Sequence, residues 1–433
     1  MIFLFRVVRI NVLIYSFISW LAEFVFYYPL IMSILWMIGG ICFYLRWEKG
    51  REETAPKLDR YPLVSVLIPA HNEERDIADA VHSIFANRYR QLEVIVINDA
   101  STDGTQEVLE GLTEEYPKLR ILKLEKNLGK ANGLNLALAM SHGEIILTLD
   151  ADSMLDEHAI EWAVWHFNNF PRVGAVTGNP RVRNRTSLLA KIQTAEYSSV
   201  IGLIKRTQRI LGKVMTVSGV VAAWRRTAII NAGLWSNNAI TDDIEMTWKM
   251  ETKFWDVRYE PKMVCWMLVP ETLTGIWNQR KRWAQGGVEV MRTHADVWRS
   301  WKERRIWPVY AEYFLGMFWS YSFLFCTMLW SVMLLMEYMG ISYAVYLPDI
   351  GNPLINWKGS VISLVCLIQF AVSIFIDGHY DRTLMKNYFW VVWYPVVYWI
   401  FNALAAVSAA PAGLRRDMST MAVWASPDRG IKP

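Results

Sequence analysis

Hydrophobic and polar positions divide the chain into apolar ends and a middle part with the pattern of a soluble domain. In the middle part, short apolar runs alternate with segments of helical periodicity. The runs predict buried strands and the segments between them predict helices. The predicted strands cover residues 63–69, 93–98, 119–124, 144–149 and 264–268. This alternation predicts an α/β fold with a doubly wound, mostly parallel sheet.

The apolar ends are long enough to cross a bilayer. Residues 1–46 predict about two transmembrane helices, and the basic end at Arg46 and Lys49 favours a cytoplasmic position for the residues that follow. Further apolar runs predict three or more C-terminal spans, at 311–337, 358–376 and 387–410. Counting three full spans places the C-terminus outside, whereas the basic residues of the tail favour the inside. Both placements remain open on the sequence.

These patterns predict six parts of the chain. The predicted parts are N-terminal transmembrane helices (1–46), a linker (47–62), a cytoplasmic α/β domain (63–270), amphipathic interface helices (271–305), C-terminal transmembrane helices (306–412) and a basic tail (413–433).

Composition supports a membrane protein with a large soluble part, because 53% of the residues are hydrophobic and only 20% are charged. The net charge of +4 is too small to indicate a nucleic-acid partner. The four cysteines are scattered, so neither a disulfide framework nor a zinc site is predicted. Twenty-two tryptophans suit membrane interfaces and also stacking on sugar rings.

Candidate chemistry begins where the strand at 144–149 ends. Asp150 and Asp152 point the same way because strand side chains alternate, and ligands bind beyond the carboxyl ends of parallel strands. Two such carboxylates suit a hard divalent cation that holds a diphosphate. An isolated pair of this kind is more often a solvated turn, so the pair alone does not decide the function.

Three other polar sites stand in a fixed order around this pair. They are Asp99 after the second strand, Thr241-Asp242-Asp243 before a helix, and Gln279-Arg280-Lys281-Arg282-Trp283 on the amphipathic segment. Each alone could be a helix cap or an interface anchor. Their order makes a functional array the stronger interpretation.

The array resembles that of the processive membrane family 2 glycosyltransferases, which include cellulose, chitin and hyaluronan synthases. The segments 173–181, 196–209 and 424–430 are most similar to the bacterial poly-β-1,6-N-acetyl-D-glucosamine synthases of that family, and the similarity covers essentially the whole chain. It implies a GT-A type domain with flanking transmembrane helices. One departure is Asp242, because the family usually has Thr-Glu-Asp at this motif.

The resemblance implies UDP-N-acetylglucosamine as the donor. Asp99 would accept hydrogen bonds from uracil, with the nucleoside and donor side bordered by Ala70, Asn72 and Lys130. Asp152 would ligate Mg²⁺ or Mn²⁺, supported by Asp150. Arg282 would complement the diphosphate charge.

On the acceptor side, Asp243 would be the general base that takes the proton from O6. Trp283 would stack on the acceptor sugar, with Gln279 and Asp242 beside it. A single base without a covalent carboxylate implies direct displacement with inversion, from an α-linked donor to a β-linked product.

The family resemblance also implies a multi-pass protein of the bacterial inner membrane that exports a growing exopolysaccharide, typical of biofilms. A small two-span membrane subunit and cyclic di-GMP regulation of the complex are further expectations. Four alternatives remain: a hyaluronan, chitin or cellulose type of synthase, a transferase to polyprenyl phosphate, a transporter whose soluble domain senses nucleotide, and a structural membrane protein.

Overall fold

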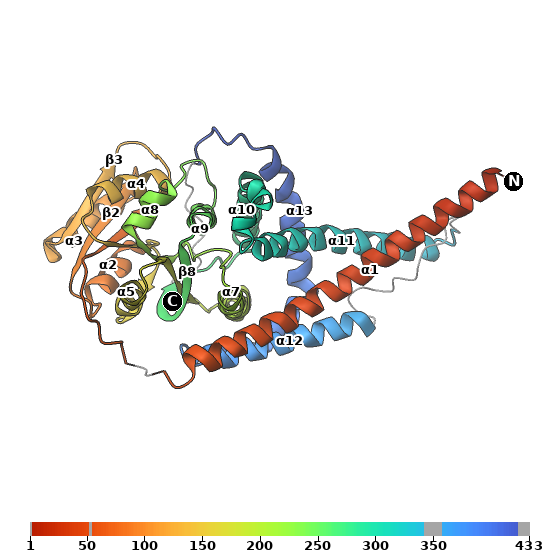
Figure 1. The fold of residues 1–433 in the computed structure, drawn as a ribbon, viewed down its shortest axis with the longest axis horizontal. Coiled ribbons are helices and arrows are strands. Elements are labelled where there is room, and N and C mark those ends of the chain that lie inside the picture. The colour runs from red at the N-terminus through yellow and green to blue at the C-terminus, as the bar shows by residue number, and fades with distance from the viewer. Residues whose placement is uncertain (1, 52–53, 342–356, 423–433) are drawn as a thin grey trace.

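A computed structural model describes the chain except for residues 1, 52–53, 342–356 and 423–433. An α/β domain forms one end of the molecule, and long helices extend from it toward the N-terminus (Figure 1). The tail motif at 424–430 lies outside the described residues.

The α/β domain is built on one eight-stranded sheet with the order β3-β2-β1-β4-β7-β6-β8-β5. Its strands are β1 (Val64–Ala70), β2 (Leu92–Asp99), β3 (Leu119–Leu124), β4 (Ile145–Leu149), β5 (Met154–Leu155), β6 (Val173–Val182), β7 (Val221–Arg225) and β8 (Asp256–Met267). Strand β1 is parallel to β2 and β4, and β2 to β3, whereas β7 is antiparallel to both neighbours. The predicted doubly wound, mostly parallel sheet is confirmed.

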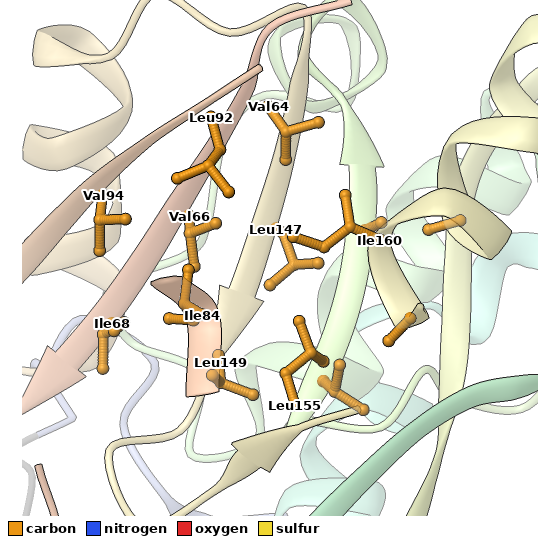
Figure 2. Close-up of a cluster of buried hydrophobic side chains, with 14 of the residues drawn as sticks. Val64, Val66, Ile68, Ile84, Leu92, Val94, Leu147, Leu149, Leu155 and Ile160 are labelled. Atoms are coloured by element: carbon orange, nitrogen blue, oxygen red, sulfur yellow. The ribbon is translucent and has the colours of Figure 1, made fainter. Parts of the chain in front are cut away.

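Helices cover both faces of the sheet because strand side chains alternate between the faces. Val64, Val66 and Ile68 of β1 join one hydrophobic core, while Leu67 joins the other. Figure 2 shows the first core, in which Ile84 and Ile160 reach the strands from two helices. Those helices are α2 (Ile77–Phe85) and α5 (Ala159–Asn169), and α3 (Thr105–Glu115) adds to the same core.

The second core packs helices on the opposite face. These are α4 (Lys130–Met140), α8 (Arg226–Ala232) and α9 (Asp242–Thr252). Helices α4 and α9 both begin with a charged residue that the sequence assigns to the site. The two-face packing therefore fixes the helix ends from which Lys130 and Asp243 project.

The N-terminal segment is one helix, α1 (Ile2–Phe43), and the prediction of two helices there is wrong. The chain between the two apolar runs, Trp20-Leu21-Ala22-Glu23, contains no glycine, proline or turn-forming residue, so nothing in it ends a helix. The charge of Glu23 is met by the ammonium group of Lys358 on another helix. The polar residue that separates the runs is therefore accommodated without a turn.

Among the described residues, three helices are long and apolar enough to cross a membrane. They are α1 with its extension to Glu48, α11 (Trp307–Tyr338) and α12 (Trp357–Asp377). Two of these helices follow residue 306 in the described part of the chain, and the prediction of three or more spans there stays a prediction. The third run divides into a 3₁₀ segment (Leu384–Trp393), a π turn (Tyr394–Tyr398) and α13 (Trp399–Arg415), and Pro395 in it has no N–H to continue an α-helical ladder.

The C-terminal tail packs on the α/β domain and on α10 (Leu273–Thr293). The Arg416 guanidinium donates to the backbone oxygen of Asn238 and pairs with Glu289, and Ala422 N–H donates to Asn237 O. The described part of the tail therefore lies against the α/β domain, and its side of the membrane stays a prediction.

A buried ion network ties the ends of α1 and α12 to the domain. Arg206, on α7 (Ile204–Leu211), donates to both oxygens of Glu48 at 2.6 and 2.9 Å and pairs with Asp377 at 2.8 Å. Arg181 of β6 pairs with the second Asp377 oxygen at 2.9 Å. Buried pairs are costly to break because one charge is left without a partner. The network therefore holds the ends of α1 and α12 in a fixed position on the sheet.

Candidate active site

The candidate site is centred on the end of β4. The Asp150 carboxylate is partly exposed, whereas Asp152 is buried and accepts a hydrogen bond from Ser153 Oγ at 2.8 Å. Lys130 Nζ, at the start of α4, donates to Asp150 Oδ1 at 2.6 Å and lies 3.3 Å from Gly219 O. The end of β4 and the start of α4 thus bring two carboxylates and a cation to one edge of the sheet.

The Lys130 ammonium group is held charged by its surroundings. Burial lowers its pKa, but the carboxylates of Asp150, Asp242 and Asp243 outweigh burial and leave the pKa raised. Lys130 is therefore a permanent positive charge at the mouth of the site. It can complement the phosphates of a nucleotide.

Asp243, in the first turn of α9, faces the same space. Its Oδ1 atom accepts the Ile244 N–H at 2.9 Å. Burial and the neighbouring Asp242 charge raise the pKa of Asp243 to about 6, while Lys130 and Arg282 oppose the rise. A carboxylate with this pKa is ionised at neutral pH and is basic enough to take a proton in a reaction.

Gly219, in the loop before β7, leaves room for this carboxylate. A Cβ at position 219 would stand 2.9 Å from Asp243 Oδ2, closer than ordinary van der Waals contact. The absence of a side chain at Gly219 therefore helps to place the Asp243 carboxylate.

We expect Gly219→Ala to lower kcat about tenfold, because displacing a reacting group by a few tenths of an ångström misaligns it. Gly111→Ala is the matched control, since a Cβ there meets no heavy atom within 4 Å. Initial rates of nucleotide release by the two purified variants test this. Equal rates for both variants would contradict the positioning role.

The Gln279–Trp283 motif lies on α10 (Leu273–Thr293). Some of its residues make structural contacts, and others line the cavity. Arg280 pairs with Glu196 at 2.6 Å and lies over the Trp283 ring, 4.5 Å from its centroid. Arg282 is exposed and lines the cavity with Trp283 and Gln279. Arg280 thus fixes the tryptophan, and Arg282 remains available to a ligand.

Two glycines bring α10 close to the site. A Cβ on Gly286 would lie 2.3 Å from Thr241 Oγ1, and one on Gly287 would lie 2.1 Å from the Tyr313 hydroxyl oxygen. These contacts leave no space for larger residues. The α10 motif is therefore packed directly against the start of α9 and against α11.

One cavity of about 1130 Å³ joins these groups. Its lining includes the site residues Lys130, Asp150, Asp152, Asp242, Asp243, Gln279, Arg282 and Trp283. It continues to the membrane helices, where Tyr28 and Trp36 of α1 and Glu312, Tyr313 and Ser320 of α11 line it. The cavity therefore connects the sheet edge with the middle of α1 and the N-terminal part of α11, two candidate membrane spans.

Comparison with known proteins agrees with this arrangement. The model of the family described as "Glycosyltransferase like family 2" matches residues 62–286. The chain belongs to glycosyltransferase family 2. The poly-β-1,6-N-acetyl-D-glucosamine synthase of Staphylococcus aureus (strain COL) is 37% identical over 94% of this chain and 98% of the relative. The synthase of that name from Staphylococcus epidermidis (strain ATCC 35984) is 35% identical over the same shares.

The fold of this glycosyltransferase is also similar to a solved mannosyltransferase from Pyrobaculum calidifontis in complex with GDP-Man and Mn²⁺. The TM-score is 0.56 with 20% sequence identity, over 91% of this chain and 99% of that one. This similarity confirms the GT-A type fold.

Three residues of the glycosyltransferase that were predicted to contact the nucleoside do not line the cavity. Asp99 is buried, and its two carboxylate oxygens accept the N–H groups of Leu128 and Gly129 at 2.8 and 2.9 Å. Asn72 has a positive φ of 58° and accepts the Thr102 N–H, while Ala70 is the buried last residue of β1. Asp99 thus shapes the loop that presents Lys130, and its contact with uracil stays a prediction.

Several residues that line the cavity of the glycosyltransferase lie outside the motifs predicted to form its site. Lys205 and Gln208 enter the lining from α7, Glu312 from α11, and Met421 and Ala422 from the tail. Lys205 and Gln208 sit in the segment that carries the family resemblance, where charged and amide residues interrupt an apolar helix face. That interruption is the sequence signal that could have identified them.

The glycosyltransferase site suits a divalent cation held jointly with a diphosphate. Among the described residues, no group of three or more His, Cys, Asp or Glu could hold a metal ion. Asp150 and Asp152 supply hard oxygen ligands from one strand end, the donor type that Mg²⁺ and Mn²⁺ prefer. Such ions are commonly bound by one or two carboxylates, with phosphate oxygens and water completing the set.

Proposed function

We propose that the protein is a processive, inverting glycosyltransferase that polymerises N-acetylglucosamine from UDP-N-acetylglucosamine into a β-1,6-linked polymer. The observation that carries this is the single cavity joining the β4 carboxylates, Asp243 and Trp283. The staphylococcal relatives support the substrate and linkage, because their similarity extends over 94% of the chain.

The donor binds with its diphosphate between Lys130, Arg282 and the β4 carboxylates. Asp152, supported by Asp150, would hold Mg²⁺ or Mn²⁺, which would supply positive charge to offset that of the diphosphate. Lys130 and Arg282 complement the same charge from two sides, since a guanidinium group matches phosphate geometry.

The acceptor sugar stacks on Trp283 with its O6 hydroxyl facing Asp243. The Asp243 carboxylate takes the hydroxyl proton as O6 forms a bond to the anomeric carbon and the bond to the diphosphate breaks. One direct displacement inverts the configuration, so an α-linked donor gives a β-linked product. Gln279 and Asp242 border the acceptor.

The pH dependence of the rate follows from the Asp243 pKa of about 6. Below this pH the base is protonated, so we expect kcat to fall as the pH drops through about 6. Asp242→Asn removes a charge that raises this pKa, and it should move the acidic limb to lower pH. Measurement of kcat from pH 4.5 to 8 tests this. If the acidic limb of the pH–rate profile stays at the same pH in Asp242→Asn, the assignment of this limb to Asp243 is contradicted.

The cavity offers the growing polymer a route toward the membrane helices. Glu312 accepts hydrogen bonds from Trp36 Nε1 at 3.2 Å and Gln208 Nε2 at 3.1 Å. Polar groups inside membrane helices are costly and usually functional. We infer that this polar lining passes saccharide from a cytoplasmic catalytic domain across the bacterial inner membrane. The two-span subunit and cyclic di-GMP control stay predictions.

A panel of donors tests the substrate assignment. Purified protein with Mg²⁺ is given UDP-N-acetylglucosamine, UDP-glucose, UDP-glucuronic acid or UDP-N-acetylgalactosamine, and radiolabel in polymer is counted. Incorporation from UDP-N-acetylglucosamine alone is the expected result. Incorporation from another donor instead would keep the enzyme class and discard this substrate.

A further inference from the structure

A buried lysine lies in the cavity wall beside the general base. Lys205 projects from α7 and is only 5% exposed, yet it lines the cavity together with Asp243 and Trp283. Lys205 has no role in the proposed reaction as described above. An amine buried at such a position is costly unless its hydrogen-bonding capacity is used.

The protein itself uses little of that capacity. Lys205 Nζ donates to Thr177 Oγ1 at 3.0 Å, and no carboxylate in the described part of the chain forms an ion pair with it. An ammonium group has three N–H donors, so this contact leaves donors to be satisfied from the cavity.

The Thr177 contact also fixes where the amine stands. Thr177 Oγ1 accepts the Ser218 N–H at 2.7 Å as well as the Lys205 amine. Ser218 precedes Gly219, which makes room for the Asp243 carboxylate. Burial lowers the pKa of Lys205 to about 7, and the Asp243 charge opposes this shift. The amine and the base are thus held by one loop.

We propose that Lys205 is a positioning residue that donates a hydrogen bond from Nζ to an oxygen of the acceptor sugar and so directs its hydroxyl group toward Asp243. The inference rests on the proposed function, because it assumes that a saccharide occupies this part of the cavity.

The cavity presents complementary groups for such a sugar. Gln279 Oε1 is a buried acceptor without a hydrogen-bond partner in the described part of the chain, and Gln279 lines the cavity. A pyranose with hydroxyl and acetamido groups offers both donors and acceptors. Lys205 Nζ therefore donates a hydrogen bond to a sugar oxygen, while Gln279 Oε1 accepts one from a sugar O–H or N–H.

The test separates acceptor binding from donor binding. Lys205→Met keeps most of the apolar stem and removes the donors. With a β-1,6-linked N-acetylglucosamine oligosaccharide as acceptor, we expect KM for the oligosaccharide to rise about tenfold to hundredfold, the loss typical of leaving a buried acceptor oxygen without its donor. KM for UDP-N-acetylglucosamine and its hydrolysis without acceptor should stay within about twofold. Lys205→Arg, which keeps a charged donor, should recover part of the acceptor affinity.

Lys213→Met is the matched control, because Lys213 is also buried but donates to Trp255 O at 3.3 Å outside the cavity lining. It should leave the oligosaccharide KM unchanged. An unchanged oligosaccharide KM in Lys205→Met, or equal rises in both KM values, would overturn the proposal. If the wild type transfers nothing to the oligosaccharide from UDP-N-acetylglucosamine, the proposed function fails instead.

Discussion

Asp243→Asn is expected to lower kcat for polymer synthesis by about 10²–10⁴-fold, the usual contribution of a general base. The asparagine amide keeps the size of the carboxylate but cannot take the acceptor proton. Donor affinity should change little, because Lys130, Arg282 and the β4 carboxylates are intact. Nucleotide release measures the rate, and calorimetric titration with UDP-N-acetylglucosamine measures the affinity.

Asp242→Asn serves as the neighbouring control for this experiment. Both residues lie in the first turn of α9, so both variants remove one negative charge from the same helix end. Asp242→Asn should retain far more activity than Asp243→Asn. Comparable losses in the two variants would show that charge at this helix end matters and that Asp243 is not the base.

Asp152→Asn, or removal of divalent metal by a chelator, is the second large effect that we expect. Either change leaves the diphosphate charge poorly neutralised as it departs, and metal stabilisation of that charge contributes several kcal/mol, or about three orders of magnitude in rate. Added Mg²⁺ or Mn²⁺ should restore the chelated wild type but not the variant.

The control is Asp103→Asn at the same edge of the sheet. The Asp103 carboxylate accepts hydrogen bonds from the Thr105 hydroxyl at 2.5 Å and the Glu74 N–H at 3.2 Å. It therefore stabilises the loop after β2. Its replacement should leave the metal requirement unchanged. Full activity of the wild type in excess chelator would contradict a metal-assisted departure.

Strands of the sheet's first half could be predicted because their apolar runs are continuous and bounded by turns. The runs at 63–69, 119–124 and 144–149 agree with β1, β3 and β4 within one residue at each end. Strand β8 was predicted from its last residues alone, since Arg258, Glu260 and Lys262 interrupt its apolar pattern. Those charges are satisfied by tertiary partners, such as His166 for Glu260, that the sequence does not reveal.

The helix count at both ends required tertiary information. Whether a polar residue such as Glu23 ends a span depends on a partner, here Lys358, more than 300 residues away. The position of the C-terminal tail likewise depends on contacts of Arg416 with the α/β domain. Counting the charged residues near each apolar run does not reveal these contacts.

The site could be predicted where short motifs carry the chemistry. Asp150, Asp152, Asp243, Arg282 and Trp283 all line one cavity, although they come from distant parts of the chain. The sequence marks Lys205 only as a charged residue on an apolar helix face, because its proximity to Asp243 arises from the packing of α7 on the sheet. The sequence thus indicates the polar residues that share the cavity, and the fold shows what surrounds them.

Product analysis tests the central claim most directly. The purified full chain in lipid, with Mg²⁺ and radiolabelled UDP-N-acetylglucosamine, should form a polymer that a β-1,6-hexosaminidase degrades to labelled N-acetylglucosamine, with no polymer from Asp243→Asn. A polymer that resists this enzyme but yields to a chitinase or hyaluronidase would contradict the proposed linkage. Polymer formation by Asp243→Asn at the wild-type rate would contradict the proposed mechanism.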